Sequence, residues 1–270
     1  MSVAPAPAKD PRPPVASPEP VDETAIYGHH AVAEAWTNPG RKIRHLVATR
    51  AALDALNDQI QAASAAGLRR PAPEIVQRAT IDARLPEGTV HQGVLASVDP
   101  LSTPTFEAML ERARERFTLL IVLDQVTDPH NVGAILRTAA AFGAAALIMT
   151  ERHAPPVSGT LAKIASGAVE HVPIIRVTNM ARTLTDLTDS GVASLGLAEE
   201  AEQTLATVVS GLPHGLSTAL VLGSEGAGLR RLTRENCTHL VRLPTSGPIA
   251  SLNVSNAAAA ALYELVRNIG

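Results

Sequence analysis

Three polar segments, each placed directly after an apolar run, carry the side chains best suited to chemistry. They are residues 124–143, Leu222-Gly-Ser-Glu-Gly-Ala-Gly228 and residues 243–264. Parallel strands that end at the same edge of a sheet bring their following loops together, and ligands bind there. The three segments therefore predict one composite pocket, although their spacing alone does not identify the reaction.

The segment from Leu243 to Glu264 begins at the end of an apolar strand and becomes an alanine-rich helix. Two prolines and a glycine between residues 244 and 248 predict a loop. Ser251 is the expected cap of a helix that runs to about Arg267. Unpaired backbone N–H groups at such a helix start suit a polar ligand, and alanines allow close approach of another backbone. The alternative is an ordinary C-terminal helix with a polar first turn.

The glycine-rich segment 222–228 resembles a nucleotide loop only superficially. Its order is G-x-x-G-x-G, which differs from the dinucleotide pattern G-x-G-x-x-G. Glu225 would also repel a pyrophosphate. A loop around a cationic or neutral ligand fits better, with Glu225 accepting hydrogen bonds. The alternative is a glycine-rich turn with one exposed acid.

Segment 124–143 combines a polar loop with a helix that Asn131 is expected to open. Arg137 follows six residues later, so the two side chains need not share one helix face. A polar loop and an arginine beside an apolar strand can hold a phosphate or a sugar. The alternative is a capped helix with a surface arginine.

Repeated strand–helix units begin at Phe117. Strands are predicted at residues 118–123, 145–149, 172–177, 192–197, 217–222 and 239–243, and helices at 131–142, 158–168, 179–189, 230–236 and 250–267. The strands are nearly continuous apolar runs, as in sheets covered on both faces. The C-terminal part is therefore expected to be α/β, with a mainly parallel, doubly wound sheet.

The chain before Phe117 divides into three parts. Residues 1–23 contain seven of the 20 prolines and are expected to form a disordered tail. Residues 24–98 read as a small α/β domain with helices at 29–37 and 51–66 and strands at 45–49 and 90–98. Residues 99–116 read as a linker that ends in a charged helical segment, and residues 117–270 form the second domain.

Basic residues predominate between residues 40 and 91, where eight Arg or Lys stand against five Asp or Glu. This excess indicates either a solvated surface or a patch that contacts phosphates. The candidate RNA-binding residues are Arg41, Lys42, Arg44, Arg69 and Arg70.

Composition limits the classes of function. Hydrophobic residues make up 46% of the 270 residues, so a large core is possible, but aromatic residues are only 2%. Few aromatics argue against RNA binding by base stacking, and a net charge of -3 requires that any nucleic-acid contact be local. One cysteine excludes an intrachain disulfide and a cysteine-cluster zinc site, and no metal is expected. Without a signal peptide or long apolar run, a cytoplasmic protein with no membrane association is expected.

The three segments, in this order, resemble the three motifs of the SpoU family of RNA ribose 2'-O-methyltransferases, of the SPOUT class. The N-terminal Ile26-Tyr-Gly-His-His-Ala-Val-Ala-Glu34 and His91-Gln-Gly-Val94 resemble the L30e-like substrate-binding domain of that family. Lys163-Ile-Ala-Ser-Gly-Ala-Val-Glu170 is similar to the bacterial branch that methylates a guanosine of 23S rRNA. The resemblance covers about residues 25 to 268.

This resemblance implies S-adenosylmethionine as cofactor, bound in a C-terminal trefoil knot, and a homodimer through the C-terminal domains. Matched by position, Gly223, Leu243 and Leu252 are the implied cofactor contacts, together with the adjoining Leu222 and Ile249. The implied catalytic residues are Arg137, Asn131, Glu225, Ser251 and Asn253.

Arginine is an awkward base because it is effectively always protonated. We therefore expect Arg137 to bind the adjacent phosphate and hold the ribose. Asn131 would shape the site, Glu225 would hold the loop or the substrate, and Ser251 and Asn253 would order the cofactor loop.

The preferred function is methylation of a guanosine in 23S rRNA, with 23S rRNA or a ribosome-assembly intermediate as the partner. Two alternatives remain: a tRNA ribose methyltransferase, and a non-catalytic RNA-binding assembly factor that retains the scaffold. A nicotinamide-dependent dehydrogenase would suit the sheet, but the chain lacks its glycine fingerprint.

Overall fold

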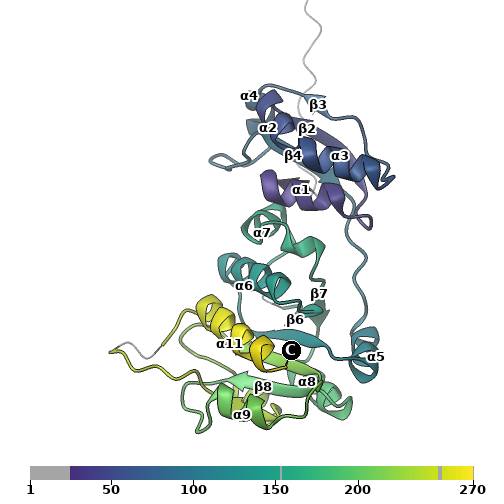
Figure 1. Ribbon diagram of the computed structural model, residues 1–270. Helices are drawn as coiled ribbons and strands as arrows, with labels where there is room; N and C mark the ends of the chain where they lie inside the picture. The colour runs from purple at the N-terminus through teal and green to yellow at the C-terminus, as the bar shows by residue number, and fades with distance from the viewer. Residues whose placement is uncertain (1–24, 153, 249–250, 270) are drawn as a thin grey trace, which may run out of the picture.

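The computed structural model describes residues 25–152, 154–248 and 251–269. Figure 1 shows two α/β units, one above the other, joined by an extended segment that ends at α5 (Phe106–Glu115). The predicted tail, residues 1–23, and the predicted cofactor contact Ile249 lie outside the described residues.

The N-terminal unit is a four-stranded sheet in the order β1-β4-β2-β3. Its strands are β1 (Ala25–Tyr27), β2 (Ile43–Ala48), β3 (Glu74–Ile75) and β4 (Val94–Val98). Its helices are α1 (His29–Thr37), α2 (Arg50–Ala55), α3 (Asn57–Ala65) and α4 (Arg78–Asp82). The predicted helix at 29–37 is confirmed, whereas the one at 51–66 is two helices that meet at Leu56. The sequence pattern did not predict the short strands β1 and β3.

The C-terminal unit contains a six-stranded parallel sheet in the order β10-β8-β9-β5-β6-β7. All six predicted strands are confirmed. They are β5 (Leu119–Asp124), β6 (Ala146–Thr150), β7 (Ile174–Val177), β8 (Ala193–Leu197), β9 (Thr218–Gly223) and β10 (His239–Val241).

Helices cover both faces of this sheet. They are α5, α6 (Pro129–Ala141), α7 (Gly159–Ile164), the 3-10 helix η1 (Ala168–Glu170), α8 (Met180–Asp189), α9 (Leu205–Gly211), α10 (Arg231–Glu235) and α11 (Val254–Ile269). Alternate residues of β5 enter different clusters, as the two-residue period of a strand requires. Ile121 packs with α6 and α11, whereas Val122 packs with α5 and α8. The doubly wound arrangement is thus confirmed.

Two helix starts differ from the sequence predictions. Helix α6 begins at Pro129, not Asn131, because Asp128 caps it by accepting a hydrogen bond from His130 N at 2.9 Å. Helix α11 begins at Val254, so Ser251 does not cap it. Asn253 Oδ1 instead accepts from Ser255 N at 2.9 Å. Helix α9 was also missed, although Thr204 supplies a side-chain cap.

The path of the chain between β10 and α11 would decide whether the C-terminal segment threads a knot. Residues 249 and 250 of this path lie outside the described residues. The trefoil knot therefore stays a prediction, while the α/β fold around it is established by the strand order.

Candidate active site

Asn131, Glu225 and Asn253 form one hydrogen-bonded cluster that joins all three polar segments. Asn131 Nδ2 donates to Glu225 Oε1 at 3.1 Å, and Asn253 Nδ2 donates to Asn131 Oδ1 at 3.1 Å. Asn253 Nδ2 also donates to Glu225 Oε1. A single carboxylate oxygen therefore accepts from both amides, which fixes the ends of β5, β9 and β10 relative to one another.

Each amide in the cluster is oriented by its own helix. Asn131 is buried in the first turn of α6, where its Nδ2 also lies 3.4 Å from Asp128 Oδ2. Asn253 Oδ1 accepts from the backbone N and the hydroxyl of Ser255, at 2.9 and 2.6 Å. Because its oxygen is engaged in capping α11, the NH₂ group of Asn253 must face Asn131 and Glu225. The first turn of α11 thus determines which side of the Asn253 amide donates.

The loop that carries Glu225 is a tight turn closed by its own backbone. Ser224 N donates to Gly228 O at 3.1 Å, and Gly228 N donates to Ser224 O at 2.9 Å. A Cβ added at Gly223 would lie 2.2 Å from the carbonyl carbon of Gly228, so only glycine fits there. Gly226 and Gly228 both have positive φ, at 77° and 64°. The glycines of this segment therefore serve the turn geometry rather than a pyrophosphate.

An ion pair between the buried carboxylate of Asp124 and the half-exposed side chain of Arg230 lies next to this loop. Asp124, at the end of β5, is fully buried and accepts from Arg230 Nε at 2.7 Å and Arg230 N at 3.0 Å. Arg230 directly precedes α10, so the pair ties the end of the glycine loop to the neighbouring strand. The sequence placed Asp124 in the polar loop, but it gave no sign of this partner.

A cavity of about 480 Å³ lies beside the cluster, within the size range of small-molecule sites. Its lining includes four of the five predicted cofactor contacts, together with Ser251 and Glu225; the four are Leu222, Gly223, Leu243 and Leu252. Val254 and Ala257 of α11 add apolar surface. The two loops predicted to bind a cofactor thus share one cavity.

Part of the lining was not predicted. Residues 197–200, which are the last residue of β8 and the three that follow it, border the cavity, as do Arg234 and Arg242. Arg234 forms an ion pair with Glu200 across the rim. The predicted strand at 192–197 ends at the same sheet edge as the strands that precede the other loops. Because ligands bind at the carboxyl ends of parallel strands, Glu199 and Glu200 could have been predicted from the sequence to line the pocket.

Arg137 lies apart from the cavity. It is exposed on α6, and no hydrogen bond or ion pair with another described residue holds its side chain. It is not among the residues that line the cavity. Within one chain, the predicted catalytic arginine and the predicted cofactor contacts therefore do not share a pocket.

The predicted RNA-binding set divides in two. The Arg41 side chain is only 6% exposed and pairs with Glu170, so it is not available to a phosphate. Arg70 donates to the backbone carbonyls of Trp36, Arg41 and Asn38 at 2.6 to 2.7 Å, which makes it a structural residue.

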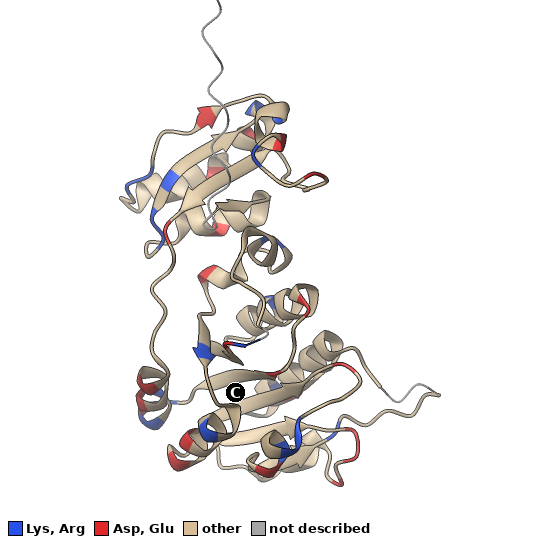
Figure 2. Ribbon diagram, turned by 180° about the vertical axis from the view of Figure 1, so that it is seen from behind, with Lys and Arg blue, Asp and Glu red and all other residues tan. Residues whose placement is uncertain are grey.

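Lys42, Arg44 and Arg69 are exposed and remain candidates for RNA contact. Lys42 and Arg44 both pair with Asp99 and lower the pKa of that carboxyl, Arg44 most strongly. Exposed pairs of this kind contribute little to stability. Figure 2 shows basic segments of both units with acidic segments nearby, so any RNA contact is local.

Comparison with known proteins follows the two structural units. Residues 118–263 match the SpoU rRNA Methylase family, and residues 25–104 match the RNA 2'-O ribose methyltransferase substrate binding family. The chain belongs to the SpoU family of RNA ribose methyltransferases. The predicted family is thereby confirmed, and the substrate-binding match spans the N-terminal sheet and the start of the linker.

Relatives within the SpoU family match nearly the whole chain. The 23S rRNA (guanosine-2'-O-)-methyltransferase RlmB of Pseudomonas aeruginosa is 42% identical over 245 residues, which are 90% of this chain and 95% of that protein. The protein of the same name from Ralstonia nicotianae is 43% identical and covers 90% of this chain and 94% of its own.

Solved SpoU structures share the fold. A putative RNA methyltransferase of the TrmH family from Porphyromonas gingivalis has a TM-score of 0.69, with 27% identity over 90% of this chain and 89% of its own. AviRb from Streptomyces viridochromogenes, solved in complex with the cofactor AdoMet, has a TM-score of 0.68. It is 23% identical and covers 90% of this chain and 89% of that one.

The described residues contain neither a metal-binding cluster nor a membrane-spanning helix. Within residues 25–152, 154–248 and 251–269, no cluster of three His, Cys, Asp or Glu side chains is arranged to hold a metal ion. No helix in the same part of the chain has the length and apolar character needed to cross a membrane.

Proposed function

We propose that this chain transfers a methyl group from S-adenosylmethionine to the ribose 2'-hydroxyl of a guanosine in 23S rRNA. The observation that carries the proposal is the shared cavity, which is bordered by Gly223, Leu243 and Leu252 and lies beside the Asn131–Glu225–Asn253 cluster. Relatives about 42% identical over 90% of the chain are named for this reaction. A ribosomal substrate also implies a cytoplasmic location.

The cavity suits the proposed donor in size and chemistry. Leu222, Leu243 and Leu252 offer apolar surface for an adenine ring, and the turn at Gly223 lets backbone groups approach the ligand closely. Glu225 places a carboxylate at the rim, which favours a cationic group over a phosphate. When bound, S-adenosylmethionine supplies an electrophilic methyl carbon on a positively charged sulfur.

The reaction needs alignment and the removal of one proton. The ribose oxygen forms a bond to the methyl carbon while the carbon–sulfur bond breaks, and the electron pair of that bond stays on sulfur. The hydroxyl proton must leave for a base or for solvent. The protein's main contribution is to hold oxygen, carbon and sulfur in line, and the fixed amides of Asn131 and Asn253 give the site that rigidity.

Arg137 is assigned a phosphate-binding role. Its guanidinium stays protonated, so it is a poor proton acceptor but a good bidentate ligand for the phosphate beside the target ribose. Its position on the exposed surface of α6, away from the cavity of its own chain, supports a composite site in which the arginine of one protomer serves the cavity of its partner.

The homodimer that this requires would use the outer surface of α11. Tyr263 is 58% exposed and Val266 is 37% exposed on this helix, and α11 packs directly beside α6, which carries Arg137. Exposed large apolar side chains next to a proposed catalytic residue favour a partner surface there. The dimer is thus proposed to bury α11 and to deliver Arg137.

The principal alternative is a tRNA ribose methyltransferase. The N-terminal substrate-binding domain favours ribosomal RNA, because it adds a second RNA contact region to the catalytic unit. Mapping 2'-O-methylated nucleotides in RNA from cells that lack the gene tests this choice. Loss of one methylguanosine from 23S rRNA supports the proposal, and loss from tRNA with intact rRNA overturns it.

A further inference from the structure

A buried ion pair joins the two structural units. Glu170, in η1 of the C-terminal unit, is only 1% exposed, and Arg41 of the N-terminal unit is 6% exposed. Arg41 Nη2 donates to Glu170 Oε1 at 2.7 Å, and Arg41 Nε lies 3.0 Å from Oε2. Asn38 Nδ2 donates to the same Oε2 at 2.9 Å. Both oxygens of one carboxylate are therefore held by the other unit.

The backbones around this pair approach too closely for larger residues. A Cβ at Gly167 would lie 2.5 Å from Glu34 Cγ, and Gly167 has a positive φ of 84°. A Cβ at Gly159 would lie 2.4 Å from the carbonyl oxygen of Ala25. Tyr27 Oη is hydrogen-bonded to Thr160 Oγ1 at 2.9 Å. We call these contacts, with the Glu170 pair, the interdomain joint.

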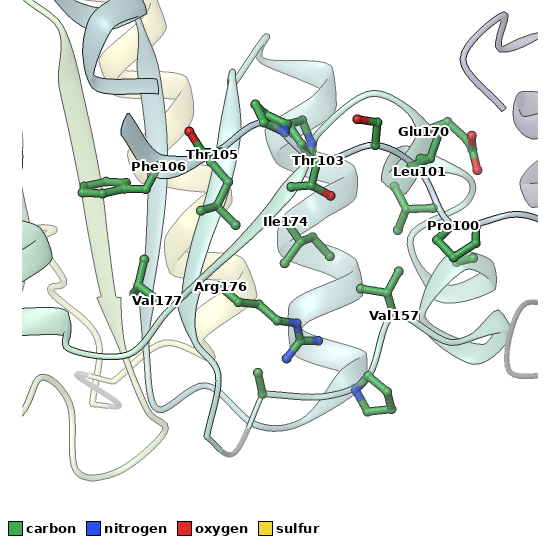
Figure 3. Close-up of a pocket in the computed structure, with 18 of the residues that line it drawn as sticks. Pro100, Leu101, Thr103, Thr105, Phe106, Val157, Glu170, Ile174, Arg176 and Val177 are labelled. Atoms are coloured by element: carbon green, nitrogen blue, oxygen red, sulfur yellow. The ribbon is translucent and has the colours of Figure 1, made fainter. Parts of the chain in front are cut away.

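The middle of the linker, residues 100–104, contributes much less. Figure 3 shows Pro100, Leu101 and Thr103 of the linker on one side of a cavity and Ile174 and Arg176 of β7 on the other. This cavity has a volume of about 1520 Å³, so the linker stands away from the sheet edge that it crosses. The relative orientation of the units must then be set by the joint.

The ion pair is well suited to fix an orientation. A largely buried carboxylate and guanidinium that separate lose their attraction, while much of their desolvation cost remains. The bidentate geometry also restricts rotation, unlike an apolar contact. The joint therefore favours one orientation of the two units, in which the ion pair is intact, over orientations in which the pair is broken.

We propose that the interdomain joint, with Glu170 as its central positioning residue, holds the N-terminal unit at a fixed orientation for RNA. The inference rests on the proposed function and deepens it. Lys42 follows Arg41 directly and is exposed, so fixing Arg41 also fixes this candidate phosphate contact. RNA bound at the N-terminal unit then meets the methyl-transfer site at a high effective concentration.

Pulsed electron paramagnetic resonance tests the orientation without using activity. Spin labels are attached at Asp58→Cys on α3 and Asp189→Cys at the end of α8, both exposed, in a Cys237→Ala background. The wild-type joint gives one narrow distance distribution, and Glu170→Ala broadens it. Glu34→Gln is the matched control, because Glu34 forms an exposed interdomain pair with His171 and should leave the distribution narrow.

Kinetics on RNA supplies the second readout. Glu170→Ala should raise KM for long 23S rRNA fragments about tenfold, while kcat and donor affinity stay within about twofold, because only effective concentration is lost. A short fragment that contacts the C-terminal unit alone should show no change. If Glu170→Ala does not fold, Glu170→Gln decides, with a smaller broadening and a smaller rise in KM expected.

A narrow distribution in folded Glu170→Ala or Glu170→Gln, or a broad one in the wild type, overturns the proposal. An unchanged KM for long RNA does the same. If the wild-type protein methylates no RNA, the proposed function fails, and the distance distributions still decide whether the joint exists.

Discussion

The side-chain amides of Asn131 and Asn253 are hydrogen-bonded to each other at 3.1 Å, although 122 residues separate them in the sequence. Both amides also donate to Glu225 Oε1. Three loops that follow three strands are thus joined by hydrogen bonds between polar side chains. These hydrogen bonds hold the site rigid. Removing one donor should therefore affect the alignment of the reacting groups more than the folding of the chain.

Asn253→Asp isolates that donor. The aspartate oxygen can still cap α11 by accepting from Ser255 N, but the group facing Asn131 and Glu225 no longer donates. We expect the rate of methyl transfer to fall about 100-fold, since misplacing reacting groups by about 1 Å has that effect. The free energy of unfolding should change by about 1 kcal/mol. Single-turnover kinetics and chemical denaturation measure the two.

Asn253→Ala serves as the comparison, because it removes the cap and the donor together. It should lose about 1 kcal/mol more stability than Asn253→Ser, which keeps a capping oxygen. A wild-type rate in Asn253→Asp would show that the amide frame has no part in the reaction.

Arg137→Ala should abolish most methyl transfer while leaving donor binding unchanged. Arg137 is exposed, and it does not line the cavity. We expect a decrease of about 100-fold in the single-turnover rate, with Arg137→Lys intermediate because lysine keeps the charge but not the planar fork. Calorimetric titration with S-adenosylmethionine supplies the binding control. A near-normal rate in Arg137→Ala would remove this residue from the mechanism.

Mixing two inactive variants tests the composite site. Arg137→Ala keeps an intact cavity, and Gly223→Ala keeps an intact arginine. If the arginine serves the partner's cavity, randomly mixed dimers recover roughly a quarter of the wild-type active sites. If each arginine serves its own chain, the mixture stays inactive, and the proposed arrangement is wrong.

Gly223→Ala should prevent donor binding. Its Cβ would lie 2.2 to 2.4 Å from backbone atoms of residues 228 and 229, which cannot move without opening the turn. We expect a destabilisation of about 2 kcal/mol or more and loss of measurable affinity for S-adenosylmethionine. Gly247→Ala is the matched control in the third loop, because no atom lies within 4 Å of its added Cβ. Equal affinity in both variants would contradict the proposed site.

The thiol of Cys237 gives a prediction about pH. Burial, with a smaller contribution from Asp124, raises the pKa of Cys237 from 9.0 to about 12. Between pH 9.0 and about 12, the Cys237 thiol therefore keeps its proton in the folded state and loses it in the unfolded chain. This contribution to stability is complete below pH 9 and is lost as the pH rises toward 12. Chemical denaturation between pH 8 and 11 measures the free energy of unfolding, which should fall more steeply with pH in the wild type than in Cys237→Ala. Equal slopes in the two proteins would contradict the prediction.

The sequence predicted the C-terminal strands well because most of them are nearly continuous apolar runs. Such runs are buried on both faces and need no partner to be recognised. The N-terminal unit was harder, since β1 has only three residues and β3 only two. Their strand character comes from pairing with β4 and β2 rather than from their own composition.

The candidate site residues were chosen by residue type and order along the chain, and their contacts with one another were not predicted. No local signal could show that Asn253 rather than Ser251 caps α11, because both residues are good caps. Arg41 and Arg70 looked like surface charges, yet their partners are Glu170 and backbone carbonyls far along the chain. Charge counting gives the number of basic residues in a segment and not their burial.

The most direct measurement is nucleoside analysis after reaction in solution. Purified protein is incubated with methyl-labelled S-adenosylmethionine and unmodified 23S rRNA or tRNA, and the digested RNA is examined by mass spectrometry. The account predicts labelled 2'-O-methylguanosine from 23S rRNA, and its absence with Arg137→Ala. Label on a base, label in tRNA alone, or no label with folded protein and bound donor would contradict it.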